Sequence, residues 1–96
     1  MTKIYLVPQP EFPLGELYVT ASADKTLATD DIRAALVRHA RGDWGDMNSV
    51  GLMENEAGLK HGFRLHSVYH DHNGVTFWII TESDRSVTTV LLPDDY

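Results

Sequence analysis

Hydrophobic and polar residues alternate over the last third of the chain in the way that is typical of β-strands. Three such runs cover residues 64–70, 75–82 and 87–92. The first two are separated by Asn73-Gly74, and the last two by the polar segment 83–86. Because Asn-Gly readily adopts the positive backbone angles of a tight hairpin, the pattern predicts a three-stranded antiparallel meander.

A two-residue turn at Asn73-Gly74 would fix the pairing of the first two strands, with Phe77 opposite His70 and Ile79 opposite Val68. A four-residue loop at 83–86 would place Val90 beside Ile79. Both faces of the meander would then be apolar, one carrying Val68, Phe77, Ile79, Val90 and Leu92, the other Leu65, Tyr69, Trp78, Ile80 and Leu91. Helices on one face would leave the other to the N-terminal segment, a second subunit or a ligand.

The first two thirds of the chain predict two helices after one strand. Residues 15–20 are predicted as a strand, residues 4–7 as at most a short edge strand, and residues 21–24 as a connector. A helix is expected over residues 30–41, capped by Thr29 or Asp30 and ended by Gly42, because Ile32, Ala35, Leu36 and His39 share one helical face.

A second helix is expected from a cap at Ser49 to an end at Lys60-His61-Gly62, although Gly51 and Gly58 each cost about 1 kcal/mol inside a helix. The element order is therefore β-α-α-β-β-β. It predicts one α+β domain over residues 1–96, with a mainly antiparallel sheet of about four strands and two helices packed on one face.

Composition narrows the class of function. The 96 residues include no cysteine, which excludes disulfides and thiolate metal ligands, and the formal net charge of -6 disfavours direct nucleic-acid binding. No hydrophobic run is long enough for a signal peptide or a membrane span, so a cytoplasmic protein without membrane contact is expected. No cofactor motif and no familiar catalytic motif is present, which favours a non-enzymatic role.

Two polar loops contain candidate contact residues. In the segment Gly42-Asp43-Trp44-Gly45-Asp46, the tryptophan can anchor a protein partner between two carboxylates, or it can close the end of the core. In the segment 82–86, Arg85 can bind a phosphate or small molecule, or it can hold the turn together through a nearby carboxylate. The structural reading is favoured in both loops.

Three histidines suggest a metal site. His66, His70 and His72 have the same parity in an extended strand, so their rings would point to one side with Asp71 nearby. Imidazoles with a carboxylate bind zinc or nickel. Three exposed strand histidines without a metal are the commoner arrangement.

The segments GDWGD and KHG, followed by FWIITESDRSVTTVLLPDDY, make the chain resemble a group of small uncharacterised bacterial proteins described as plasmid-related or hypothetical. The early Phe12-Pro13-Leu14-Gly15 element also fits this group. The resemblance implies a bacterial, mobile-element-associated context and no particular biochemical activity.

These observations lead to three hypotheses. The first is a non-catalytic protein-interaction module or homodimer, with Trp44, Tyr69, Trp78 and Arg85 at the interface, flanked by Asp43 and Asp46. The second is an acidic inhibitor of a host nucleic-acid-binding or defence protein, using a ridge of Asp30, Asp31, Asp43, Asp46, Glu54 and Glu56. The third is a metal-binding protein or small enzyme that uses His66, His70 and His72.

Overall fold

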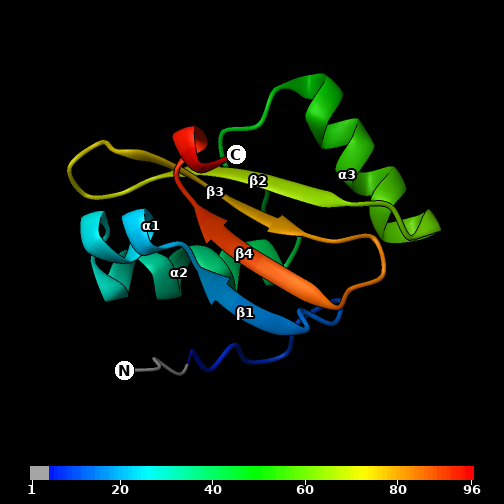
Figure 1. The fold of residues 1–96 in the computed structure, drawn as a ribbon. Coiled ribbons are helices and arrows are strands. Elements are labelled where there is room, and N and C mark those ends of the chain that lie inside the picture. Colours follow the sequence, from blue (N-terminus) through cyan, green and yellow to red (C-terminus); the bar gives the residue numbers. More distant parts are fainter. Residues whose placement is uncertain (1–4) are drawn as a thin grey trace.

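A computed structural model describes residues 5–96, which form a four-stranded sheet with helices on one face and along one edge (Figure 1). The elements are β1 (Glu16–Val19), α1 (Ala21–Thr26), α2 (Thr29–Ala40), α3 (Ser49–His61), β2 (Leu65–His70), β3 (Thr76–Thr81), β4 (Val87–Leu91) and the 3-10 helix η1 (Pro93–Asp95). The predicted α+β class and mostly antiparallel sheet are confirmed.

The strand order is β1-β4-β3-β2. The strands β2, β3 and β4 form the predicted antiparallel meander, whereas β1 joins β4 in parallel. Consequently β1 and β2 form the two edges of the sheet. The predicted edge strand at 4–7 does not form over residues 5–7, and residue 4 lies outside the described residues.

The helices differ from the prediction in number and position. The expected connector at 21–24 lies within α1, which begins because the Thr20 hydroxyl accepts a hydrogen bond from the Ala23 amide at 3.2 Å. In Figure 1, α1 and α2 lie on one face of the sheet, and α3 lies beyond the outer edge of β2. The third helix therefore shields an edge of the sheet rather than a face.

The helix ends follow local sequence closely. The predicted core face of α2 is confirmed, since Ile32, Ala35, Leu36 and His39 are all buried. Its N-cap is Ala28 rather than Thr29 or Asp30, and that of α3 is Asn48 rather than Ser49, with the Asn48 side chain accepting from Gly51 at 2.7 Å. Gly62 ends α3 in the predicted left-handed conformation, with φ of 78°.

The pairing of β3 with β4 is as predicted, with Ile79 opposite Val90, but the pairing of β2 with β3 is shifted by one residue. Ile79 lies opposite Ser67, and Phe77 lies opposite Tyr69. The turn comprises residues 72–74, and the Asp71 side chain before it accepts hydrogen bonds from the Asn73 and Val75 amides. That bonding produces a longer loop than Asn73-Gly74 alone would.

The corrected register separates the two faces of the sheet. The face toward α1 and α2 carries the main core, which includes Tyr69, Phe77, Ile79 and Val90. The opposite face carries His66, Val68, His70, Trp78 and Leu91, and is therefore more polar than the prediction of two apolar faces implied. The C-terminal segment lies over this second face, where the Tyr96 ring contacts Trp78 at a centroid distance of 5.7 Å.

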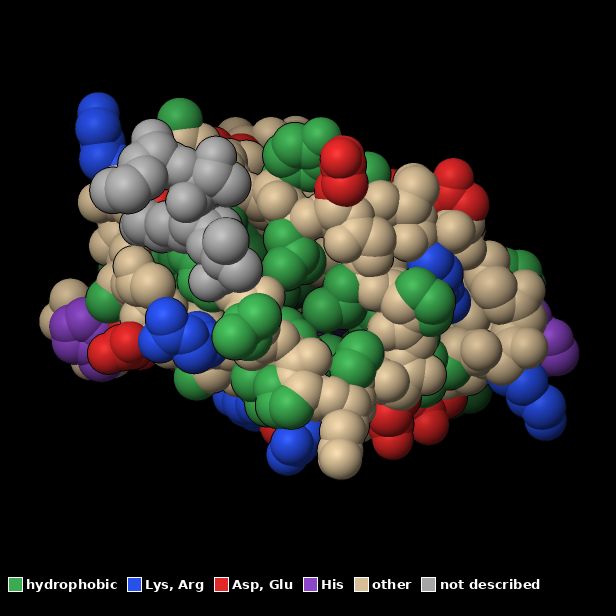
Figure 2. Space-filling model, turned by 90° about the horizontal axis from the view of Figure 1, so that it is seen from below, with side chains coloured by type: hydrophobic (Ala, Val, Ile, Leu, Met, Phe, Trp, Pro, Cys, Tyr) green, Lys and Arg blue, Asp and Glu red, His purple; other side chains and the backbone are tan. Residues whose placement is uncertain are grey.

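Figure 2 shows the molecule from the side of β1 and the N-terminal segment, where hydrophobic side chains gather in the middle of the view and charged ones lie around them. Leu6 and Tyr18 are among the exposed apolar residues of these elements. Among the helices formed by residues 5–96, none is long and apolar enough to cross a membrane.

Candidate functional site

The GDWGD segment covers the outer edge of β2. The Asp46 amide donates to the Val68 carbonyl at 2.8 Å, and the Val68 amide donates to the Trp44 carbonyl at 3.1 Å. Gly45 has a φ of +71° and lies so close to the backbone of Val68 that a side chain there would collide with it. The segment therefore acts as a short extra strand that protects an edge.

Trp44 is buried inside the chain. Its side chain is 4% exposed, its ring stacks on Phe12 at 6.2 Å, and its indole nitrogen donates to Glu56 Oε2 at 3.0 Å. Tyr69 is 2% exposed, and its hydroxyl donates to the Asp43 carbonyl at 2.6 Å. Neither predicted interface residue is open to a partner in this structure, because both fill the space between α2 and the sheet.

Asn55 completes the protection of the β2 edge. Its side-chain oxygen accepts from the His66 amide at 2.9 Å, and its side-chain nitrogen donates to the His66 carbonyl at 2.7 Å. The carboxamide thus replaces a neighbouring strand. A lone asparagine inside a helix gave no sequence signal of this role.

Arg85 holds the end of α3 to the β3–β4 turn. Its guanidinium donates to the Gly58 carbonyl at 2.8 Å and to the Phe63 carbonyl at 2.7 Å. These acceptors lie in and just after the last turn of α3, where the helix dipole favours a positive charge. The contacts are with backbone carbonyls rather than with the carboxylate that the sequence suggested.

The three histidines of the predicted metal site have three different sets of neighbours. His66 packs edge-on against Trp78 at 4.6 Å, while His70 Nε2 lies 3.1 Å from Asp46 Oδ2. His72 Nδ1 lies 2.6 Å from Asp31 Oδ2. The predicted triad is therefore wrong, because His72 belongs to the Asp71 loop and no longer continues the strand.

The predicted acidic ridge is partly neutralised by two arginines. Asp30 pairs with Arg33 at 3.0 Å, and Asp43 accepts two hydrogen bonds from Arg38 at 2.7 and 3.2 Å. The Arg38 contact is the main reason that the pKa of Asp43 is lowered. As described above, Asp31 contacts His72 and Asp46 contacts His70. Glu56 contacts Trp44.

A chain of buried polar side chains crosses the core beneath these loops. It begins at Ser67, whose Oγ lies 2.6 Å from His39 Nδ1, and continues from His39 Nε2 to Thr81 Oγ1 at 2.9 Å. Thr81 then contacts Thr88 at 2.7 Å, and the Thr88 hydroxyl donates to the Leu14 carbonyl at 2.7 Å. The chain connects α2, three strands and the N-terminal segment.

The last bond fixes the direction of all the others. Since the single hydroxyl proton of Thr88 goes to Leu14, Thr88 must accept from Thr81, and Thr81 must accept from His39 Nε2–H. Nδ1 then accepts from Ser67, because burial lowers the pKa of His39 to about 3 and keeps the ring neutral. Ser67 and His39 are fully buried, so this pair is closed to a substrate and serves the fold.

The most accessible candidate surface lies where α3 meets the second face of the sheet. We call a group of four residues the aromatic face: Arg64, His66, Trp78 and Tyr96. The Arg64 guanidinium lies 5.0 Å from the centre of the Tyr96 ring, Tyr96 contacts Trp78, and Trp78 contacts His66. Burial is the main reason that the pKa of His66 is lowered, and its Nε2 is enclosed without a hydrogen-bond partner among the described residues.

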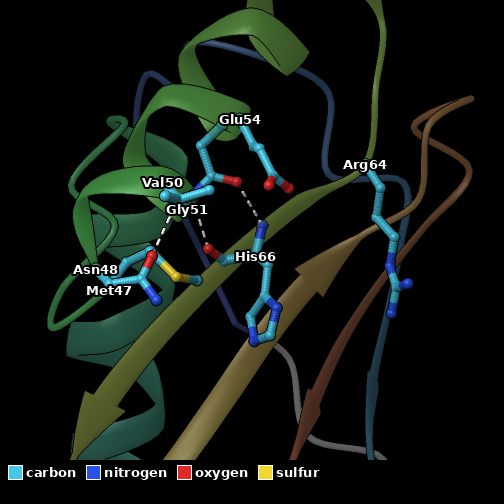
Figure 3. Close-up of a pocket in the computed structure, with 8 residues that line it drawn as sticks. Met47, Asn48, Val50, Gly51, Glu54, Arg64 and His66 are labelled. Atoms are coloured by element: carbon cyan, nitrogen blue, oxygen red, sulfur yellow. Dashed lines mark hydrogen bonds between the residues drawn. The ribbon is translucent and has the colours of Figure 1, made fainter.

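A cavity of about 320 Å³ separates the aromatic face from α3. Figure 3 shows it between Val50 and Glu54 on the helix and Arg64 and His66 on the strand side. The outer side of α3 next to the cavity is apolar: Val50 is 62% exposed and Met53 is 73% exposed. Apolar residues at such exposure on a helix gain little from folding, which points to a contact outside the chain.

No protein-family model, curated protein or solved structure matches this chain. The resemblance to plasmid-related bacterial proteins stays a prediction.

Proposed function

We propose that this chain is a non-catalytic protein-interaction module, which binds a second copy of itself or another protein through the outer side of α3 and the aromatic face. The observation that carries this proposal is the exposure of Val50 and Met53 beside a cavity lined by Arg64 and His66. Two further large apolar residues at the ends of this region, Phe63 and Tyr96, are also exposed.

The composition of the surface suits a protein partner. Aromatic residues, methionine and arginine are enriched in the buried centres of protein interfaces, and a polar rim surrounds them. Here Tyr96 contacts both Trp78 and Arg64, Met53 is exposed on α3, and Glu54 lines the same cavity as Arg64. An apolar side chain of the partner would fill the cavity, while Arg64 would pair with a carboxylate at its edge.

The acidic-inhibitor hypothesis has less support. Two of its six carboxylates, Asp30 and Asp43, pair with arginines of the chain, so the ridge offers a partner less uncompensated charge than the sequence implied. Complex formation with a basic protein that weakens strongly with salt, and that survives loss of the α3 surface, would favour that hypothesis instead.

The proposal predicts that the double variant Val50→Ser/Met53→Ser weakens association about 30- to 700-fold, because apolar interface anchors contribute roughly 1–2 kcal/mol each, or about 2–4 kcal/mol for the two. Sedimentation velocity over a range of concentrations measures self-association. For a partner captured from a bacterial lysate, the same variants are compared by titration calorimetry.

The matched control is Leu6→Ser. Leu6 is 79% exposed but belongs to the N-terminal segment, beside β1 rather than α3 (Figure 1). Association that is lost in this control and kept in the α3 variant would contradict the proposed surface and favour the β1 side of the molecule.

A further inference from the structure

A second cluster lies where the loop between β2 and β3 meets the start of α2. It consists of Asp31, Asp71 and His72, which each contribute one carboxylate oxygen or ring nitrogen, and these atoms lie within 4.8 Å of one another. It is the only such group of potential metal ligands found among residues 5–96. The fold thus brings His72 to two aspartates rather than to the other strand histidines.

Asp71 has a buried carboxylate with one unused oxygen. The residue is 7% exposed, and its Oδ1 accepts from the Asn73 amide at 2.9 Å and the Val75 amide at 2.7 Å. Its Oδ2 is enclosed and has no hydrogen-bond partner among the described residues. A buried charged oxygen is costly unless it is paired, so an unpaired one in a folded protein points to a bound ion or water.

Asp31 and His72 provide access from solvent. His72 Nδ1 lies 2.6 Å from Asp31 Oδ2, and the exposed fractions of these side chains are 63% for His72 and 25% for Asp31. Asp31 is in the first turn of α2, where the helix dipole favours its charged form. An ion can therefore reach the two carboxylates past the exposed imidazole.

We propose that Asp31, Asp71 and His72 bind one divalent transition-metal ion of the zinc class. Two carboxylates balance the charge of a dication, and the imidazole favours zinc, nickel or copper over magnesium and calcium, which prefer oxygen ligands alone. The ion would pair with the unused Asp71 oxygen, which no side chain of the described residues does.

The spacing of the ligand atoms suits such an ion after a small adjustment. Donors around tetrahedral zinc, at about 2.0–2.2 Å from the metal, are roughly 3.4 Å from one another. The 2.6 Å contact between His72 and Asp31 would open slightly, and the other two distances, which are within 4.8 Å, would close by at most about 1.4 Å. The metal would replace the proton shared by that pair.

Three protein ligands leave a coordination position for water or an external ligand. The site would also tie the loop between β2 and β3 to the start of α2, across about 40 residues of chain. Binding to the folded state alone would raise the stability of the fold as the metal concentration rises.

The experiment is a calorimetric titration of metal-free full-length protein with zinc chloride near neutral pH, with magnesium chloride in parallel. One zinc ion per chain is expected, with a dissociation constant in the micromolar range or below. Asp71→Asn and His72→Gln should each weaken zinc binding at least roughly tenfold, as loss of one metal ligand does. Magnesium should bind much more weakly.

The matched control is the pair His70–Asp46, an exposed imidazole and carboxylate 3.1 Å apart. The variants His70→Gln and Asp46→Asn should leave zinc binding unchanged, because this pair lacks the buried second carboxylate. Equal losses in both pairs would indicate weak binding to surface histidines and would overturn the proposal.

Three other results would also overturn it: no heat with zinc, zinc binding that survives Asp71→Asn, or magnesium binding as tight as zinc. Asp71→Asn keeps an oxygen for the two backbone amides of the loop. If it still fails to fold, His72→Gln decides the matter, because an exposed side chain can be replaced without disturbing the core.

Discussion

His39 and Asp71 are both buried polar residues, and they differ in how completely their neighbours satisfy them. Both ring nitrogens of His39 have side-chain hydroxyl partners within the core, at 2.6 and 2.9 Å. Asp71 has two backbone donors on one oxygen and none on the other. This difference indicates that His39 serves the fold alone, whereas Asp71 has one oxygen that can still bind a ligand.

His39, whose ring is fully hydrogen-bonded, is also the residue that destabilises the fold more when the pH falls. A neutral, fully bonded imidazole is stable in the core only while it stays neutral, since an added proton would remove the acceptor that Ser67 uses. Asp71 has the opposite property, because it is charged already and would gain from a cation. Three measurements can break or sharpen this distinction.

The largest expected effect is acid destabilisation through His39. Burial, followed by the nearby His66 and Arg85 charges, lowers the pKa of His39 from 6.5 to about 3. The unfolded chain therefore takes up the proton first, and stability falls as the pH falls from 6.5 toward 3, by up to about 1.4 kcal/mol per pH unit and about 5 kcal/mol in all. Urea unfolding at a series of pH values measures this slope.

Other titratable groups change the stability over different pH ranges. Arg38 lowers the pKa of Asp43, so the stability that Asp43 contributes is lost only at more acidic pH. Asp31 raises the pKa of His72, so the stability that His72 contributes is lost as the pH rises through that pKa. Over the window from pH 6.5 to about 4.5, the loss of stability therefore reports His39 together with the half-buried His66, whose pKa is also lowered by burial. A stability that does not change over this window would contradict the assignment of His39 as neutral and buried.

The second-largest effect on stability is expected when the His39 ring is removed. His39→Leu should lower the free energy of unfolding at neutral pH by about 2–4 kcal/mol, because the Ser67 hydroxyl loses its acceptor inside the core. Adding Ser67→Ala should restore roughly 1 kcal/mol of this loss, since the unpaired hydroxyl is then absent. Urea unfolding of the two single variants and the double variant measures the coupling. Strictly additive losses would mean that the two side chains do not act as a pair.

The smallest effect is expected at Asp71 without metal. Asp71→Asn should change the free energy of unfolding by no more than about 1 kcal/mol in a chelator, because the two amide contacts are kept and an unpaired charge is removed. In zinc at 100 times the dissociation constant, the wild-type chain alone should gain about 2.7 kcal/mol. Thermal unfolding with chelator and with zinc compares the two proteins directly. A large loss of stability in the chelator would mean that Asp71, like His39, serves the fold.

The local sequence was sufficient where neighbouring residues decide the structure. The 3.6-residue spacing of Ile32, Ala35, Leu36 and His39 predicted the core face of α2, and Gly62 predicted the end of α3. The alternation in the last third predicted the meander and the pairing of Ile79 with Val90. A histidine on a core face of a helix was the one sequence signal of the buried polar chain.

The candidate sites depended on contacts that the sequence did not specify. Asp71 competed with Asn73-Gly74 for the turn through its side chain, and this moved β2 by one residue and separated His72 from His66 and His70. Asp31 was predicted only as a member of the acidic ridge, since nothing local indicates that it meets a residue about 40 positions later. For Trp44 the sequence favoured a role in closing the core over a role as a partner anchor, and the contacts at the edge of β2 show that it is buried in the core.

The sequence by itself therefore determined the four strands, the helices α2 and α3, and the α+β class. Only the tertiary structure decided which polar groups are satisfied, which are left with unused capacity, and which apolar side chains of α3 stay exposed. The physical reason is that periodicity and turn preferences act over a few residues, whereas burial and hydrogen-bond partners depend on segments that meet only when the whole chain has folded.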